Sequence, residues 1–187
     1  MSLRLSGGRR LQSPAGLGAR PTPARVRQAV MNMLAAELPG CRWLDLCSGS
    51  GAMACEALLR GAARVVAVDQ DRSHVAVARA NLEAVVRGLG PGEREALVRR
   101  NEVLRWLQAG RERAGEQPFD LIYADPPYAT GIHAPLAEAV LRQDWLRRQG
   151  TLLLECASAR LPELLPGWKL LDQRRYGTTT VLRLQQP

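Results

Sequence analysis

The chain has 187 residues, of which 46% are hydrophobic and 24% charged, and its formal net charge is +8. This composition is ordinary for one globular domain, and no apolar run is long enough to cross a membrane. The first residues lack the apolar stretch of a signal peptide, and the four cysteines (Cys41, Cys47, Cys55 and Cys156) have the spacing of neither a disulfide framework nor a zinc site. We therefore expect a cytoplasmic protein that uses no membrane and no metal.

The positive charge is concentrated near the start of the chain. The first 36 residues contain no acidic residue and six arginines, namely Arg4, Arg9, Arg10, Arg20, Arg25 and Arg27. A GC-rich genome explains why arginine replaces lysine, but it does not explain why acids are missing. Arginine binds phosphate bidentately, so this stretch favours a nucleic-acid partner. We expect a basic arm or small hairpin over residues 1–20 and one domain over residues 21–187.

The remaining chain alternates between strand and helix patterns. Thr22-Pro23 predicts the N-cap and first residue of a helix that ends at Pro39-Gly40. Strands are then expected over 42–46, 64–69, 95–99 and 119–125, and helices over 52–59, 72–86, 102–109 and 132–141. Residues 150–156 predict another strand, and 168–176 with 178–184 predict a terminal antiparallel hairpin. Repeated βα units predict an α/β fold with a doubly wound, mostly parallel sheet.

A glycine-rich loop, residues 47–51, follows the first expected strand of this sheet. Glycine lets the backbone turn tightly and lets a ligand approach without meeting a Cβ. Open α/β sheets bind ligands beyond the carboxyl ends of their strands. The residues expected to line a cofactor site here are Gly49, Ser50, Gly51 and Cys47, with Asp45 orienting the amino-acid portion of the ligand.

Asp69 closes the second parallel strand, about twenty residues after the loop. A carboxylate there can accept hydrogen bonds from two ribose hydroxyls, with Gln70 beside it. Asp71 is a weaker candidate, because it is expected to cap the next helix. The ligand is still open at this point, since residues 49–54 also match the G-x-G-x-x-A pattern of dinucleotide-binding loops.

Asp125-Pro126-Pro127-Tyr128 ends a later strand and points to the chemistry. An exocyclic amine on a base is a poor nucleophile, because its lone pair is delocalised into the ring. The Asp125 carboxylate and the Pro126 carbonyl can accept its two hydrogens and turn the lone pair towards an electrophile. The prolines stiffen the backbone, and Tyr128 can stack on an extruded base. We expect all four residues to act in catalysis.

These motifs, in this order, resemble class I amino-methyltransferases, which act on adenine N6, cytosine N4 or guanine N2. Longer strings narrow the resemblance: residues 20–27 (Arg-Pro-Thr-Pro-Ala-Arg-Val-Arg), 44–52, 56–58 and 60–62 are similar to the RsmD family of 16S ribosomal RNA guanine-N2 methyltransferases. The resemblance covers nearly the whole chain. It implies a Rossmann-like, seven-stranded sheet and S-adenosyl-L-methionine as cofactor.

The resemblance also implies a substrate and further site residues. The target would be a guanine N2 amine in 16S rRNA, presented on the small ribosomal subunit or on an assembly intermediate. Asn101 and Glu102 would lie by the adenine of the cofactor, and Thr22 and Arg20 would help to close the site. Arg4, Arg9, Arg10 and Arg20 would contact the RNA. The arm, residues 3–11, is shorter than the basic hairpin usual in this family, and Cys47-Ser48 stands where Phe-Ala is common.

Three other functions compete with this one. A DNA adenine-N6 or cytosine-N4 methyltransferase would share the fold, but we see no room for a DNA-recognition domain. A nicotinamide-dependent oxidoreductase would need a catalytic Tyr/Lys pair or a histidine, and the one lysine, Lys169, is far along the chain. A non-catalytic RNA-binding module would have no use for Asp125 to Tyr128. His74 and His133 are expected at the surface, without a role in catalysis.

Overall fold

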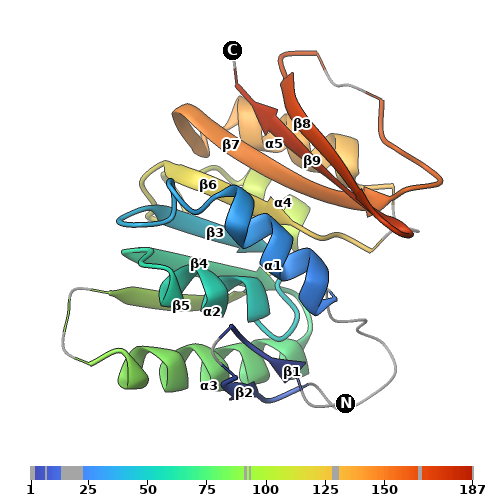
Figure 1. Cartoon of the computed structure of the whole chain (residues 1–187). Helices are drawn as coiled ribbons and strands as arrows, with labels where there is room; N and C mark the ends of the chain where they lie inside the picture. Colours follow the sequence, from blue (N-terminus) through green and yellow to red (C-terminus); the bar gives the residue numbers. More distant parts are fainter. Residues whose placement is uncertain are drawn as a thin grey trace. The chain divides into compact units, whose positions relative to one another are not determined.

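The computed structural model describes residues 3–6, 8–13, 23–90, 92, 94–127, 131–163 and 166–186. The chain divides into two compact units, Met1–Arg100 and Asn101–Pro187, and each is described by itself. Figure 1 shows the whole chain, coloured along the sequence.

A three-stranded parallel sheet forms the centre of the first unit. Its order is β5 (Glu95–Arg100), β4 (Arg64–Asp69) and β3 (Arg42–Leu46). β3 and β4 run in register from Arg42 opposite Arg64. Both strands are almost wholly buried after their first residue, which is why they read as short, near-continuous apolar runs. Because parallel strands share a direction, the loops after β3 and β4 emerge at the same edge of this sheet.

Three helices accompany this sheet: α1 (Ala24–Met33), α2 (Ala52–Leu59) and α3 (Arg72–Gly88). α2 matches its predicted range, and Asp71 caps α3 as expected, accepting hydrogen bonds from the backbone N–H groups of Ser73 and His74. The prediction for α1 is wrong at both ends. Pro23 is the N-cap and not the first helical residue. The helix ends at Met33, well before Pro39, because the chain continues in non-helical turns that still bury Leu34 and Leu38.

The basic arm forms a short antiparallel hairpin, in which β1 (Leu3–Arg4) pairs with β2 (Arg10–Leu11). In Figure 1 this hairpin lies beside α3. Leu5 and Leu11 are buried, so the arm packs on the first unit by an apolar side and leaves Arg4 and Arg10 exposed. The two strands thus form a hairpin within the stretch that the sequence predicts as a basic arm.

The second unit contains strands in the order β6 (Phe119–Ala124), β7 (Leu146–Ala157), β9 (Thr179–Gln185) and β8 (Lys169–Tyr176). β6 and β7 are parallel, whereas β7, β9 and β8 are antiparallel. Its helices are α4 (Val103–Gln108) and α5 (His133–Arg142). An aromatic cluster of Trp106, Trp145 and Phe119 is buried in this unit.

In the described part of the chain, seven strands belong to one mostly parallel sheet that ends in an antiparallel pair. The predicted α/β, doubly wound, Rossmann-like class with a C-terminal antiparallel hairpin is confirmed. No helix among the described residues is both long enough and apolar enough to span a membrane.

Candidate functional site

The loop after β3 is held in an unusual backbone conformation. Cys47, Gly49 and Gly51 have φ angles of 58°, 52° and 73°, all in the left-handed region. Cys47 adopts this conformation without being a glycine, which costs about 1–3 kcal/mol and is tolerated where the surroundings fix the backbone. Two hydrogen bonds do so: Ser48 N–H donates to Val68 O (3.1 Å), and Gly51 N–H donates to Ser48 O (2.8 Å).

The two glycines of the loop do different work. A Cβ placed on Gly49 would meet no atom within 4 Å, so the space over Gly49 is open. A Cβ on Gly51 would lie 3.1 Å from the Ala78 Cβ, because α3 packs tightly against the loop there. Gly49 therefore leaves room for a ligand, and Gly51 allows close packing between the loop and a helix.

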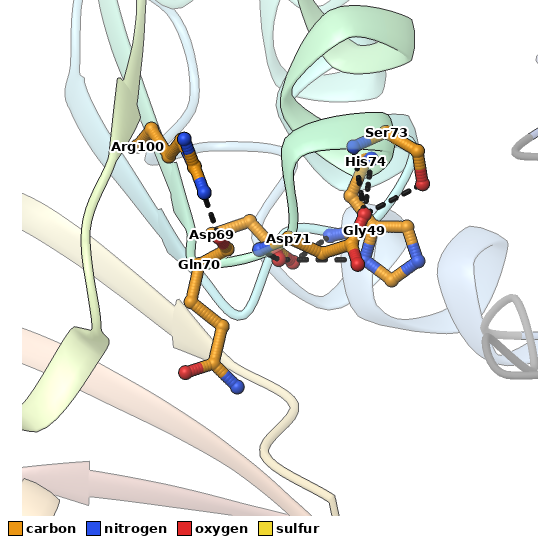
Figure 2. Close-up of polar contacts among 7 residues, drawn as sticks. All are labelled: Gly49, Asp69, Gln70, Asp71, Ser73, His74 and Arg100. Atoms are coloured by element: carbon orange, nitrogen blue, oxygen red, sulfur yellow. Dashed lines mark hydrogen bonds and ion pairs between the residues drawn. The ribbon is translucent and has the colours of Figure 1, made fainter.

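Asp69 ties the end of β4 to this loop (Figure 2). Its Oδ2 accepts a hydrogen bond from Gly49 N–H (2.8 Å), and its Oδ1 accepts one from Asp71 N–H (2.9 Å). The residue is 7% exposed, so these bonds are little weakened by solvent. The carboxylate thus holds the glycine turn in place and remains at the edge of the site.

His74 is a third partner of Asp69, which the sequence analysis missed. Its Nδ1 lies 3.3 Å from Asp69 Oδ1, and its side chain is 21% exposed. Among the described residues, Gly49, Asp71 and His74 occupy three of the about four acceptor positions that a carboxylate offers, which leaves one for a ligand. The contact could not be predicted from the sequence because it depends on the start of α3. The Asp71 cap places His74 in the first turn of this helix, facing back towards the end of β4.

The other residues expected around the cofactor are placed as follows. Asp45 is 2% exposed, and its Oδ2 accepts a hydrogen bond from Ala54 N–H (3.0 Å) at the start of α2. Cys47 is half-buried and Ser50 is buried. Gln70 is exposed, with its carbonyl held by Arg100 Nε (3.4 Å; Figure 2).

Three observations on this loop fit an S-adenosylmethionine molecule. The space above Gly49 is open, and Asp69 retains an acceptor position. Ser48 Oγ is buried and makes no hydrogen bond within the residues that the structure describes. A buried hydroxyl without a partner is costly, so a polar ligand that supplied one would be favoured. No group of three or more potential metal ligands is found among the described residues.

The second unit carries the Asp-Pro-Pro segment at the carboxyl end of β6. Residues 121–124 of this strand are buried, Asp125 is half-buried, Pro126 is buried and Pro127 is exposed. The buried strand therefore anchors this segment, which reaches the surface at Pro127. Tyr128 lies outside the described residues.

Asn101 and Glu102 also belong to the second unit. Asn101 is exposed. Both carboxylate oxygens of Glu102 are engaged in capping α4: Oε1 accepts from Leu104 N–H (2.9 Å) and Oε2 from Arg105 N–H (2.7 Å). Gly49, Asp69 and their neighbours thus lie together in the first unit, whereas Asn101 and Glu102 belong to the second unit.

The arginines of the arm differ in their surroundings. Arg4 and Arg10 are exposed, whereas Arg9 turns back onto α3, where its Nη1 donates to Ala84 O (3.1 Å) and Val85 O (3.4 Å). Arg9 therefore holds the arm against α3. Arg20 and Thr22 lie outside the described residues.

The expectation that both histidines lie at the surface is wrong. His74 is half-buried against Asp69, and His133 is 9% exposed, with Nε2 3.2 Å from Glu155 O. Burial lowers the pKa of His133 below its usual value, so it is neutral at physiological pH.

A glycine loop after one strand and a carboxylate after the next, in a mostly parallel sheet with an antiparallel end, are features of class I S-adenosylmethionine-dependent methyltransferases, and the comparisons place the chain in this class. The family model described as "Conserved hypothetical protein 95" matches residues 5–185, and the chain belongs to this family, as its resemblance to the RsmD family predicts.

Relatives and solved structures agree with this assignment. The chain is 31% identical to "Putative rRNA methyltransferase YlbH" of Bacillus subtilis, over 93% of this chain and 91% of the relative. It is 29% identical to "Ribosomal RNA small subunit methyltransferase D" of Escherichia coli K12, over 91% and 81%. The solved structure of "Putative methyltransferase yhhF" from Escherichia coli matches with a TM-score of 0.82 and 26% identity, over 100% of this chain and 98% of that one.

Proposed function

We propose that this chain transfers a methyl group from S-adenosylmethionine to the exocyclic N2 amine of a guanine in 16S rRNA. The observation that supports this most directly is the Asp125-Pro126-Pro127-Tyr128 segment at the carboxyl end of β6, in a family with relatives named as small-subunit ribosomal RNA methyltransferases. The substrate is 16S rRNA in the small subunit or in an assembly intermediate.

On the cofactor side, most of the residues proposed to bind and orient the ligand belong to the first unit. S-adenosylmethionine, when bound, supplies an electrophilic methyl group on a sulfonium. Asp69 accepts a hydrogen bond from a ribose hydroxyl, at the position that Gly49, Asp71 and His74 leave. The other residues proposed to line the cofactor are Asp45, Cys47, Ser50, Gly51, Gln70, Thr22, Asn101 and Glu102. In this role Glu102 would act mainly through the cap that it provides for α4, because both of its oxygens are used there.

On the substrate side, the Asp125 carboxylate and the Pro126 carbonyl accept hydrogen bonds from the two N–H groups of the target amine. This turns the nitrogen lone pair out of conjugation with the ring and towards the methyl group. One of the two amine protons is released to solvent once the nitrogen carries the methyl group. Pro127 keeps the backbone extended, and Tyr128 stacks on the extruded base. The reaction needs no histidine base, since positioning and fixed dipoles provide the rate enhancement.

The exposed arginines of the arm, Arg4 and Arg10, contact the phosphate backbone of the RNA, together with Arg20. Arg9 takes part in this contact through the arm that it docks. The arm and the domain over residues 21–187 thus divide the work between RNA binding and catalysis.

The decisive experiment is methyl transfer from labelled cofactor to small ribosomal subunits that lack their native modifications, followed by nucleoside analysis. We expect N2-methylguanosine with the wild type and none with Asp125→Ala. Asp120→Ala is a matched control, because Asp120 lies at the opposite end of the same strand and its ion pair with Arg147 (2.8 Å) is partly exposed, and such a pair is worth about 0–1 kcal/mol. Label on naked DNA, or on an adenine or cytosine, would overturn the proposed substrate and leave the fold and cofactor in place.

A further inference from the structure

Asn81 joins the arm to the glycine loop. This residue lies inside α3 and is 3% exposed. Its Oδ1 accepts from Gln12 N–H (2.9 Å), and its Nδ2 donates to Gln12 O (3.0 Å) and to Ser50 O (2.9 Å). One buried amide thus contacts the segment that follows β2 and the residue between Gly49 and Gly51.

The amide group is specific to this arrangement. Gln12 presents a donor and an acceptor, and Ser50 presents a second acceptor. Asparagine offers one acceptor and two donors, so all three bonds are made at once. An aspartate would keep the bond from Gln12 N–H but would set a carboxylate against two carbonyl oxygens. The Asn81 amide therefore matches the hydrogen-bonding groups of Gln12 and Ser50, and does more than fill space between them.

The arm is docked at further points on the two helices that flank the loop. On α2, Glu56 is 2% exposed, and its Oε1 accepts from Ser6 N–H (2.9 Å). On α3, Arg9 donates to the carbonyls of Ala84 and Val85. Gly88 leaves room for the second contact, because a Cβ there would push the Arg9 guanidinium out of its present position. These contacts hold the arm on α2 and α3.

We propose that Asn81 is a positioning residue that couples docking of the arm to the conformation of the cofactor loop. A docked arm holds Gln12 against Asn81, and Asn81 then holds the Ser50 carbonyl and with it the turn on which the cofactor rests. Cofactor affinity therefore depends on the arm, and by linkage the bound cofactor holds the arm down. This rests on the proposed function in one respect: since RNA binds the arm there, RNA and cofactor influence each other's affinity.

The test uses the full chain with S-adenosylhomocysteine as the probe and needs no RNA. Gly88→Ala displaces the Arg9 guanidinium while keeping its charge and leaving Asn81 and the loop untouched. We expect S-adenosylhomocysteine to bind several-fold more weakly to Gly88→Ala and to Asn81→Ala, and the double variant to be no weaker than Asn81→Ala alone. Arg87→Ala, an exposed neighbour on the same helix, should bind like the wild type. If Asn81→Ala does not fold, Asn81→Ser replaces it, because serine is too short to reach both Gln12 and Ser50 and places no charge in this buried position.

A second measurement separates coupling from simple structural support. Trypsin cleavage after Arg9 and Arg10, followed by mass spectrometry, reports how often the arm dissociates from α2 and α3. Saturating S-adenosylhomocysteine should slow this cleavage several-fold in the wild type and should have no effect on it in Asn81→Ala. Cleavage that is independent of the ligand in the wild type, or additive losses of affinity in the double variant, would overturn the coupling. Absence of any binding by the wild type would instead refute the cofactor site itself.

Discussion

Replacing Asp69 by asparagine tests how the glycine loop is held. The carboxylate accepts a backbone N–H on each oxygen, from Gly49 on Oδ2 and from Asp71 on Oδ1. An amide has one oxygen and one NH2 group. Whichever way it is turned, one of these two N–H groups then faces a donor. The substitution changes few atoms, yet it removes either the bond from Gly49, which joins β4 to the glycine turn, or the bond from Asp71, which fixes the connection between β4 and α3.

The size of the effect follows from the lost bond. A hydrogen bond to a charged acceptor contributes about 1.5–3 kcal/mol, and Asp69 is shielded from solvent at 7% exposure. Each 1.4 kcal/mol corresponds to about a tenfold change in affinity. Because the bound cofactor requires the ordered loop, we expect Asp69→Asn to weaken S-adenosylhomocysteine binding by about 10–100-fold.

Titration calorimetry on the purified variants measures this directly. Asp71→Asn is the matched control: it changes the neighbouring acid, which caps α3 through its side chain, and asparagine caps helices equally well. Asp71→Asn should therefore bind S-adenosylhomocysteine with an affinity within about twofold of that of the wild type. If Asp69→Asn also bound within twofold of the wild type, the carboxylate would not organise the loop and our assignment of the site would be wrong.

Three further predictions concern other parts of the chain. Neutralising Arg4 and Arg10 together, with Arg9 left in its seat, should reduce the salt dependence of RNA binding by a slope of about 1.4–1.8; an unchanged slope would exclude the arm as a phosphate contact. Because burial lowers the pKa of His133, the unfolded chain binds the extra proton before the folded chain does, so the free energy of unfolding decreases as the pH falls below about 6.5. Urea titrations between pH 7.5 and 5.5 should show a smaller decrease for His133→Gln than for the wild type, and an equal decrease would contradict this role of His133. Iodoacetamide should label half-buried Cys47 before Cys55, where burial raises the pKa, and S-adenosylhomocysteine should protect Cys47; equal labelling with and without it would place the ligand elsewhere.

The parallel strands could be predicted closely from the sequence, but β7 could not. β3 and β4 match their predicted ranges, because each is a short apolar run bounded by glycine or a charged residue. β7 begins four residues earlier than predicted, at Leu146. Its first part contains Arg147, Arg148 and Gln149, all exposed, at a register shift where Phe119 pairs with Leu146 and Leu121 with Thr151. Gln149, with a φ of 68°, lies in this bulge, and a bulge breaks the periodicity on which strand prediction depends.

The site divides in a similar way. Gly49, Asp69 and Asp125 follow strands directly, so their place at a strand end could be predicted from the sequence. His74 and Asn81 could not be found in this way, because His74 contacts Asp69 and Asn81 contacts the loop, and both contacts depend on how α3 is oriented. A polar residue on the buried face of a helix, as Asn81 is, was the one available signal: it is unusual, and it calls for a partner.

The structure also bears on the choice between a dinucleotide and S-adenosylmethionine, which the pattern of residues 49–54 left open. In dinucleotide-binding loops the second glycine gives the backbone access to a pyrophosphate, which binds the free N–H groups at the helix start. Here Gly51, the second glycine, packs against Ala78, and the Ala54 N–H near the start of α2 already donates to the buried Asp45 carboxylate. A pyrophosphate would therefore meet a negative charge where it needs a donor, whereas the ammonium of an amino-acid ligand would be attracted to it. The same glycine pattern thus accommodates a cationic ligand in this chain, because an acid within the preceding strand has taken the place of the phosphate.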